Sequence, residues 1–243
     1  LKVLQAPSKG GNKMSLEEAK ELEKNYKLPM PTYCLNEKNY CAKEFGALML
    51  ISKGSMRIMH IEKNRYLYQN KFKMEELAKQ IGVARTTLER NIKKLNSLDC
   101  KVLEIENSRN GIIYRLNYGT STGYNDNVHK FVTIHHDMLQ ELISAFNTNA
   151  IKVYCLLCYM TTENSFKCMT EKFICEKIGL CGDSKNNRSK IRKIITVFEV
   201  SKYIEVKKEN KFEWDEEKNK KVPRIQKLYR LCSFSEWKNA RKK

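Results

Sequence analysis

The sequence predicts an α+β protein that is mainly helical and is divided into two similar, basic halves. Three observations lead to this prediction: a large excess of positive charge, apolar residues that recur at helical spacing, and the same order of helices and strands in each half. The chain has 243 residues and a formal net charge of +18, with 46 Lys and Arg against 28 Asp and Glu. Hydrophobic residues make up 41% of the chain, which is enough for a packed core. A surface this basic is expected to bind polyanions.

Two segments divide the chain. Residues 1–30 are expected to form a flexible N-terminal arm with a short helix, because Ser15 followed by Glu18 matches a capping box. This arm either packs as a solvated helix or docks on a partner. Residues 119–127 hold two glycines among Ser, Thr and Asn and are typical of a linker. The halves are therefore predicted at 31–118 and 128–243, and both are basic, with +7 over residues 31–124 and +9 over residues 125–243.

The segment 74–92 predicts a helix-turn-helix. Ala78 and Gly82 stand four residues apart, and Leu88 follows six residues later. Two helices that cross closely need a small side chain such as Ala78, and the turn needs a residue that tolerates positive φ, such as Gly82. A helix is expected before this motif at 41–52 and a short strand at 66–68. A hairpin of strands 101–106 and 112–118 around an Asn-Gly turn is expected after it, so the order is that of a winged helix-turn-helix.

The second helix of this motif, predicted at 85–97, presents a basic face. The N-terminal residues of such a helix reach base edges in the major groove of double-stranded DNA. Arginine suits guanine, threonine suits thymine methyl groups or phosphates, and lysine suits phosphates. A winged helix used only for protein contacts is the alternative. The candidate DNA contacts are Arg85, Thr86, Thr87, Glu89, Arg90, Lys93 and Lys94 on the helix and Arg109 at the hairpin tip.

The second half repeats the pattern with a longer turn. A helix is predicted at 150–160, with Thr148 and Asn149 as caps, and another at 170–180, where Cys175 and Gly179 repeat the spacing of Ala78 and Gly82. A long turn at 181–187 leaves open whether the next helix, predicted at 188–198, reads bases or contacts only phosphates or protein. Strands at 203–206 and 226–231 are expected to enclose a long loop at 212–223, which is either a mobile wing tip near phosphate or disordered. The candidate DNA contacts of this half are Lys185, Arg188, Ser189, Lys190, Arg192 and Lys193.

The cysteines and histidines do not form a pattern typical of a metal site or an enzyme. The nine cysteines are an odd number, and Cys155 and Cys158 lie in an apolar helical run rather than on the tight turn of a zinc ribbon. The chain lacks the phosphate-binding motif Gly-x-x-x-x-Gly-Lys-Ser/Thr and the metal-binding motif His-Glu-x-x-His. No run of about 18 apolar residues is present. We therefore expect a cytosolic protein that has no catalytic residues, cofactor, metal or membrane partner.

Two tandem winged-helix units in a basic chain of this length resemble the replication initiators of bacterial plasmids, and the first unit also resembles phage replisome organisers. The resemblance implies origin binding, with each unit contacting successive turns of a repeated site, and a homodimer that acts as an autorepressor. It also implies contact with the replication or transcription machinery, and a location in the bacterial cytoplasm in association with the nucleoid or a plasmid. Two alternatives stay open: a transcriptional regulator of a plasmid, phage or conjugation operon, and a non-catalytic assembly factor whose winged helices bind proteins.

Overall fold

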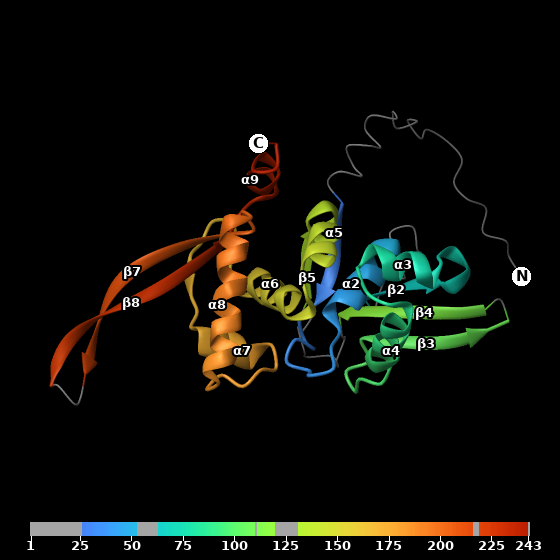
Figure 1. Ribbon diagram of the computed structural model, residues 1–243, viewed down its shortest axis with the longest axis horizontal. Helices are drawn as coiled ribbons and strands as arrows, with labels where there is room; N and C mark the ends of the chain where they lie inside the picture. Colours follow the sequence, from blue (N-terminus) through green and yellow to red (C-terminus); the bar gives the residue numbers. More distant parts are fainter. Residues whose placement is uncertain (1–25, 53–62, 110, 120–130, 216–218, 243) are drawn as a thin grey trace, which may run out of the picture.

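The computed structural model describes residues 26–52, 63–109, 111–119, 131–215 and 219–242, and in this part of the chain it combines α-helices with β-strands (Figure 1). The elements of the first half are β1 (Lys27–Pro31), α2 (Ala42–Ile51), β2 (Lys63–Tyr68), the 3-10 helix η2 (Gln69–Lys71), α3 (Met74–Gln80), α4 (Arg85–Asn96), β3 (Leu103–Ser108) and β4 (Gly111–Gly119). The elements of the second half are β5 (Phe131–His135), α5 (His136–Ala145), α6 (Thr148–Met160), β6 (Lys167–Cys168), α7 (Glu171–Lys177), α8 (Lys185–Val200), β7 (Ile204–Asp215), β8 (Lys220–Leu231) and α9 (Phe234–Asn239).

The two halves share one topology. Each contains a helix, a strand, two helices and a hairpin, in that order: α2, β2, α3, α4, β3 and β4 in the first half, and α6, β6, α7, α8, β7 and β8 in the second. The sheet orders are β2-β4-β3 and β6-β8-β7, so the last strand of each hairpin lies between the other two. In Figure 1 the β3–β4 and β7–β8 hairpins extend from opposite ends of the molecule.

The turn after the first helix of each helix pair is built in the same way in both halves. Gly82 has φ +68° and Gly179 has φ +80°, the left-handed conformation that glycine adopts without a steric penalty. Val83 N–H donates to Ala78 O at 3.0 Å and Gly82 N–H donates to Lys79 O at 3.2 Å. The equivalent bonds after α7 run from Leu180 to Cys175 at 2.8 Å and from Gly179 to Glu176 at 3.2 Å. These are the two bonds of the Schellman motif, and they confirm the small-residue and glycine spacing expected from the sequence.

The second helix of each pair buries one stripe of side chains. Leu88, Ile92 and Leu95 on α4 are buried, and so are Ile191, Ile195 and Phe198 on α8. The stripes follow the helical repeat, so the remaining faces of α4 and α8 are left to solvent. The two stripes align Arg85 with Arg188, as the sequence indicates, and α8 begins one turn earlier than α4 in this alignment.

One hydrophobic core runs through both halves. β1 and β5 pair antiparallel, with Lys27 opposite His135, and so join the starts of the two halves. α2 packs on α5 so closely that a Cβ atom on Gly46 would lie 2.8 Å from Ile143 Cδ1. The buried Lys152 on α6 donates to Glu37 O at 2.7 Å and to Ile178 O at 3.3 Å, which ties both halves to one ammonium group. The halves are therefore packed against each other and share one core, rather than being separate domains joined by a linker.

Several boundaries differ from the sequence expectation. β1 spans the expected boundary between the arm and the first half, and of the expected linker only Gly119, the end of β4, lies within the described residues. The expected arm helix lies almost entirely outside them. Asn147, rather than Thr148 or Asn149, caps α6 by accepting a hydrogen bond from Ala150 N–H. Ser184 caps α8, which therefore begins at Lys185 and includes part of the expected turn.

The prediction of a loop at 212–223 is wrong, because most of these residues continue the two strands of the hairpin. β7 and β8 pair over 12 residues each, and Phe212 lies opposite Pro223 while Trp214 lies opposite Lys221. Proline is tolerated here because β8 has a neighbour on one side only at this level, and its missing N–H faces the open edge. The tip, residues 216–218, lies outside the described residues.

Replacing Gly179 by Ala should destabilise the protein more than replacing Gly82 by Ala. Both positions have positive φ, which costs a residue with a Cβ about 1–2 kcal/mol. A Cβ on Gly82 would meet nothing within 4 Å, whereas a Cβ on Gly179 would lie 2.3 Å from Asn36 O in the other half. We expect Gly179→Ala to lower the free energy of unfolding by an additional ~1–3 kcal/mol, measured by urea denaturation. Equal effects of the two substitutions would contradict the close packing between the halves.

Candidate nucleic-acid interface

The exposed face of α4 carries a row of cations that form no ion pair. Arg90, Lys93 and Lys94 are exposed, and none of them makes a salt bridge within the described part of the chain. Thr86 is also exposed and lies one turn before Arg90, so the two side chains share a face. Thr87 and Glu89 are half-buried. The structure thus brings most of the residues predicted on this helix to one open surface.

Arg85 is held by two carboxylates. Its Nε lies 2.7 Å from Glu89 Oε1, one turn along α4, and its guanidinium also contacts Glu75 of α3. The hydrogen bond that Arg85 donates to Glu89, followed by the charge of Glu75, raises the pKa of Arg85. A ligand that binds Arg85 must compete with both carboxylates. Sequence reasoning missed Glu75, because its approach to Arg85 depends on how α3 and α4 cross.

A buried polar contact fixes α4 to α2. Asn91 Nδ2 donates to Glu44 Oε1 at 2.7 Å, and Glu44 is only 3% exposed. The second carboxylate oxygen, Glu44 Oε2, is buried and has no hydrogen-bond partner among the described residues. Because a buried carboxylate without partners is costly, the Asn91 amide holds the helix at a defined distance from α2.

The first hairpin extends beside α4 and ends in a tight turn. Ser108 lies opposite Gly111, whose φ is +110°, and Arg109 is exposed next to this turn. Asn96, the last residue of α4, accepts a hydrogen bond from Ile105 N–H at 2.8 Å. The helix and hairpin are therefore linked by a direct bond, with Arg109 at the far end of the hairpin.

α8 presents a second basic face, on which the cations differ in their partners. Arg192 makes a bidentate contact with Glu171, at 3.0 Å from Nε and 2.7 Å from the terminal nitrogen. Hydrogen bonds from Arg192, and then from Lys227, lower the pKa of Glu171. Arg188 is half-buried and lies 3.5 Å from Asp183 O. Lys185, Ser189, Lys190 and Lys193 are exposed, and the three lysines form no ion pair within the described residues.

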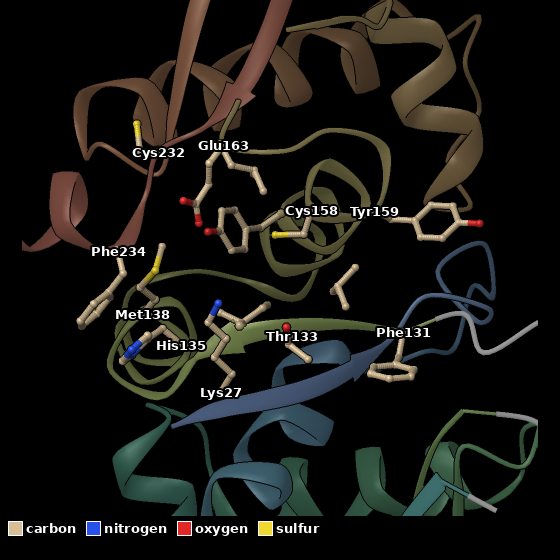
Figure 2. Close-up of a pocket in the computed structure, with 14 residues that line it drawn as sticks. Lys27, Phe131, Thr133, His135, Met138, Cys158, Tyr159, Glu163, Cys232 and Phe234 are labelled. Atoms are coloured by element: carbon tan, nitrogen blue, oxygen red, sulfur yellow. The ribbon is translucent and has the colours of Figure 1, made fainter. Parts of the chain in front are cut away.

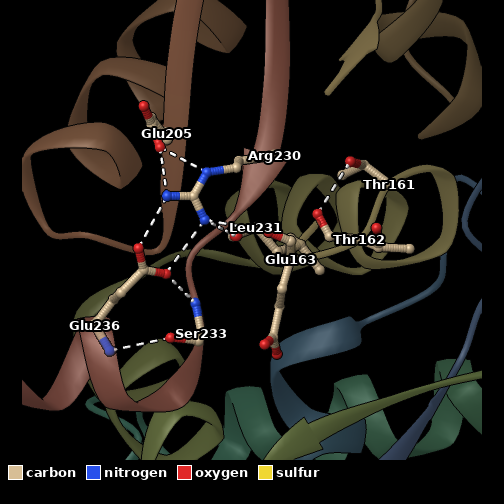
Figure 3. A network of polar contacts seen from close by, with 8 residues as sticks. All are labelled: Thr161, Thr162, Glu163, Glu205, Arg230, Leu231, Ser233 and Glu236. Carbon is tan, nitrogen blue, oxygen red and sulfur yellow. Dashed lines mark hydrogen bonds and ion pairs between the residues drawn. The ribbon is translucent and has the colours of Figure 1, made fainter. Parts of the chain in front are cut away.

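A network around Arg230 anchors the second hairpin (Figure 3). Arg230 on β8 lies 2.5 Å from Glu205 on β7 and 2.9 Å from Glu236 on α9. Ser233 N–H donates to Glu236 Oε2 at 2.7 Å, and the Ser233 hydroxyl accepts from Glu236 N–H, which forms a capping box at the start of α9. The hydrogen bond from Arg230, followed by that from Ser233 N–H, lowers the pKa of Glu236 to about 2.

A pocket of about 430 Å³ lies beside β5, where Lys27, His135, Cys158, Glu163 and Cys232 contribute to its wall (Figure 2). His135 stacks on Phe234 at 3.4 Å between ring centroids, and its buried Nδ1 has no partner. Burial raises the pKa of Cys158 to about 12 and that of Cys232 to about 11, whereas a thiol nucleophile needs a lowered pKa. These two thiols therefore lack the lowered pKa of an activated cysteine nucleophile.

The cysteines are free thiols with varied exposure. Cys34, Cys155, Cys175 and Cys232 are buried, and Cys168 and Cys181 are exposed. Within the described residues, no group of three or more His, Cys, Asp or Glu side chains is arranged to hold a metal ion. Nor does any helix in the described ranges combine the length and the apolar character needed to cross a membrane.

No protein-family model matches the chain, and none of the curated proteins matches it significantly. The functional argument therefore depends on the residues and their geometry.

Asn91→Ala should destabilise the protein by about 2–3 kcal/mol, because it leaves the buried Glu44 carboxylate without its donor. In a Glu44→Gln background the same substitution should cost less, since no buried charge is then left unpaired. Urea denaturation of the two single variants and the double variant measures this difference. An equal cost of Asn91→Ala in both backgrounds would show that the contact does not hold α4.

The Arg230 network should make stability depend on pH in the acid range. The pKa of Glu236 is lower in the folded protein than in the unfolded chain, so its contribution is complete above the unfolded value and is lost as the pH falls toward about 2. Since Glu236 is partly exposed, we expect about 1 kcal/mol or less. The stability difference between wild type and Glu236→Gln should shrink between pH 5 and pH 2, as measured by urea denaturation. Glu199→Gln is the control, because Glu199 is exposed and forms no ion pair with any residue that the structure describes. A difference for Glu236→Gln that stays constant with pH would refute the assignment.

Proposed function

We propose that the protein binds double-stranded DNA at specific sites through two tandem winged helix-turn-helix units. The observation that carries this proposal is the repetition, in both halves, of a helix pair whose second helix exposes unpaired cations and is followed directly by a hairpin. A single basic helix is usually only a solvated surface. Two basic helices at equivalent positions of the same topology favour a shared function.

The topology supports the winged-helix assignment. In that fold a helix and a short strand precede the helix pair, and the second helix of the pair enters the major groove. The hairpin, or wing, then lies beside the groove. α4 with the β3–β4 hairpin and α8 with the β7–β8 hairpin have this order, and the Schellman turns after α3 and α7 have the same pair of hydrogen bonds.

The charges of the two helices also favour an anionic partner. Neither α4 nor α8 has an acidic residue in its first turn, although the helix dipole favours negative charge there. α8 instead begins with Lys185, so a phosphate group bound near this end would supply the missing negative charge. Lysines that form no ion pair are the residues expected to neutralise phosphates and release counterions.

Among DNA-binding functions, origin binding by a replication initiator fits the geometry best. The two helices have different side chains and lie in one chain, so a single molecule reads a site without two-fold symmetry. Several molecules that bind in the same orientation then suit a directly repeated sequence. A transcriptional regulator that reads a palindrome needs two copies related by two-fold symmetry instead.

The test is a selection of binding sites from fragments of the source genome at ~150 mM salt, followed by footprinting. Directly repeated sites in an intergenic region would support the initiator. A single palindrome over a promoter would favour a transcriptional regulator. No enrichment of any fragment would refute DNA binding and favour a protein-binding assembly factor.

On a selected site, Arg90→Ala should weaken binding by about 1–3 kcal/mol and relax the base preference. Arg85→Ala should cost less, because the free protein already pairs Arg85 with Glu75 and Glu89. Lys190→Ala should weaken all sequences alike and reduce the slope of log K against log salt by about 1. Fluorescence anisotropy measures these effects, with Lys242→Ala as a control for the lost charge. If Arg85→Ala, Arg90→Ala and Lys242→Ala all reduce the affinity for the site by the same amount, base reading by α4 is contradicted.

A further inference from the structure

The two faces of the β7–β8 hairpin differ in composition. Side chains alternate between the faces of a strand, and cross-strand partners share a face. One face, named here the aromatic face, holds Phe212 and Trp214 from β7 and their partners Pro223 and Lys221 from β8. It continues toward the helices through Lys208 and Lys227, and then Val206 and Tyr229. The full set of positions on this face is Val206, Lys208, Asn210, Phe212, Trp214, Lys221, Pro223, Ile225, Lys227 and Tyr229.

None of these positions holds a carboxylate. The carboxylates Glu205 and Glu209 lie on the opposite face, where Lys207 pairs with Glu209 at 2.8 Å and Arg230 pairs with Glu205. Among the side chains that the structure describes, a carboxylate reaches a lysine of the aromatic face at the base alone, where Glu171 of α7 lies 3.1 Å from Lys227 Nζ. The outer part of the aromatic face is therefore positive and apolar at once.

On the outer part of the aromatic face the large side chains are open to solvent, whereas Tyr229 at its base is buried. Phe212 is 65% exposed, Trp214 is 59% exposed and Ile225 is 71% exposed. Neither Phe212 nor Trp214 contacts another aromatic ring within the described residues. The hairpin extends away from the helices, as Figure 1 shows, so no other element of the described chain covers this part. Exposed aromatic residues grouped on one face indicate a binding surface.

Flat aromatic rings among lysines match the chemistry of an unpaired nucleotide. A base stacks on the ring while a lysine contacts the adjacent phosphate, and this pairing of contacts tolerates any sequence. In a duplex both faces of each base pair are covered by neighbouring pairs, so the rings would have no base to stack on. A second copy of this chain, itself at +18, lacks the charge that would complement the lysines.

We propose that the aromatic face of the β7–β8 hairpin binds single-stranded DNA by stacking unpaired bases on Phe212 and Trp214. Lys208 and Lys221 contact the phosphates. This activity goes beyond the proposed binding of duplex sites by α4 and α8, and it gives one chain a surface for each form of DNA.

The experiment titrates the full chain with a fluorescein-labelled oligothymidylate of about 15 nucleotides and, separately, with a duplex carrying a selected site. Anisotropy gives both dissociation constants. Trp214 is the exposed tryptophan of the two in the chain, since Trp237 is only 5% exposed, so stacking should also quench the intrinsic fluorescence.

The double variant Phe212→Ala and Trp214→Ala should bind the single strand about 5- to 100-fold more weakly and lose the quenching. Its affinity for the duplex should change by less than about 3-fold, because substitutions at distant, independent sites affect each other little. Trp214→Phe keeps a stacking ring and should retain most of the single-strand affinity. Tyr159→Ala removes an exposed aromatic ring outside the hairpin and should change neither constant. A melting curve by circular dichroism verifies that each variant is folded.

Three results would overturn the inference. Unchanged single-strand binding by the double variant would show that the rings do not stack on bases. Equal losses for single strand and duplex would assign the hairpin to duplex contact as an ordinary wing. A smaller particle mass of the double variant, measured by light scattering, would assign the aromatic face to a second copy. If the protein binds the single strand but no duplex site, the inference stands and the proposed function is refuted. If it binds a duplex site but not the single strand, the proposed function stands and the inference is refuted.

Discussion

The packing of the two halves against each other is the constraint on which the rest of the structure depends. At Gly179 the turn between α7 and α8 lies so close to Asn36 of the first half that no Cβ atom fits. Lys152 binds a carbonyl group from each half, and β1 with β5 joins the starts of the two halves. Because protein cores are close-packed and deform little, these contacts fix α4 relative to α8. The two surfaces that we propose bind DNA are thereby held as one unit with a defined spacing.

The charge of the protein is arranged as two kinds of cation. Some are neutralised within the fold: Arg85 by Glu75 and Glu89, Arg192 by Glu171, and Arg230 by Glu205 and Glu236. These pairs position α4, α8 and the second hairpin. On the two helices, the cations without an ion pair to any described residue are Arg90, Lys93 and Lys94 of α4 and Lys185, Lys190 and Lys193 of α8. Net charge alone would have treated both kinds as equivalent, whereas the geometry separates structural cations from those available to a ligand.

The sequence was sufficient for features that depend on local geometry and insufficient for those that depend on distant contacts. Gly82 and Gly179 were recognisable because a helix pair needs a residue with positive φ at that place, and the buried stripes of α4 and α8 were recognisable from their period. The pairing of Lys27 with His135 joins residues more than 100 positions apart and leaves no local signal. The sequence predicted the base of the second hairpin but missed its outer part, because Lys, Glu and Pro223 are untypical of strands. Backbone pairing, which does not depend on these side chains, holds the two strands together. The contact of Arg85 with Glu89 follows from their spacing of four, but the contact with Glu75 requires the fold.

The most direct test of this account is to change the spacing of a selected site. Inserting about five base pairs between the two footprinted segments turns one segment to the opposite side of the duplex. Because the shared core fixes α4 relative to α8, we expect the affinity to fall about tenfold or more, and inserting a full turn of about ten base pairs should weaken binding as well. An affinity unchanged by either insertion would contradict the account, since it would show that the halves bind DNA independently or that only one of them binds.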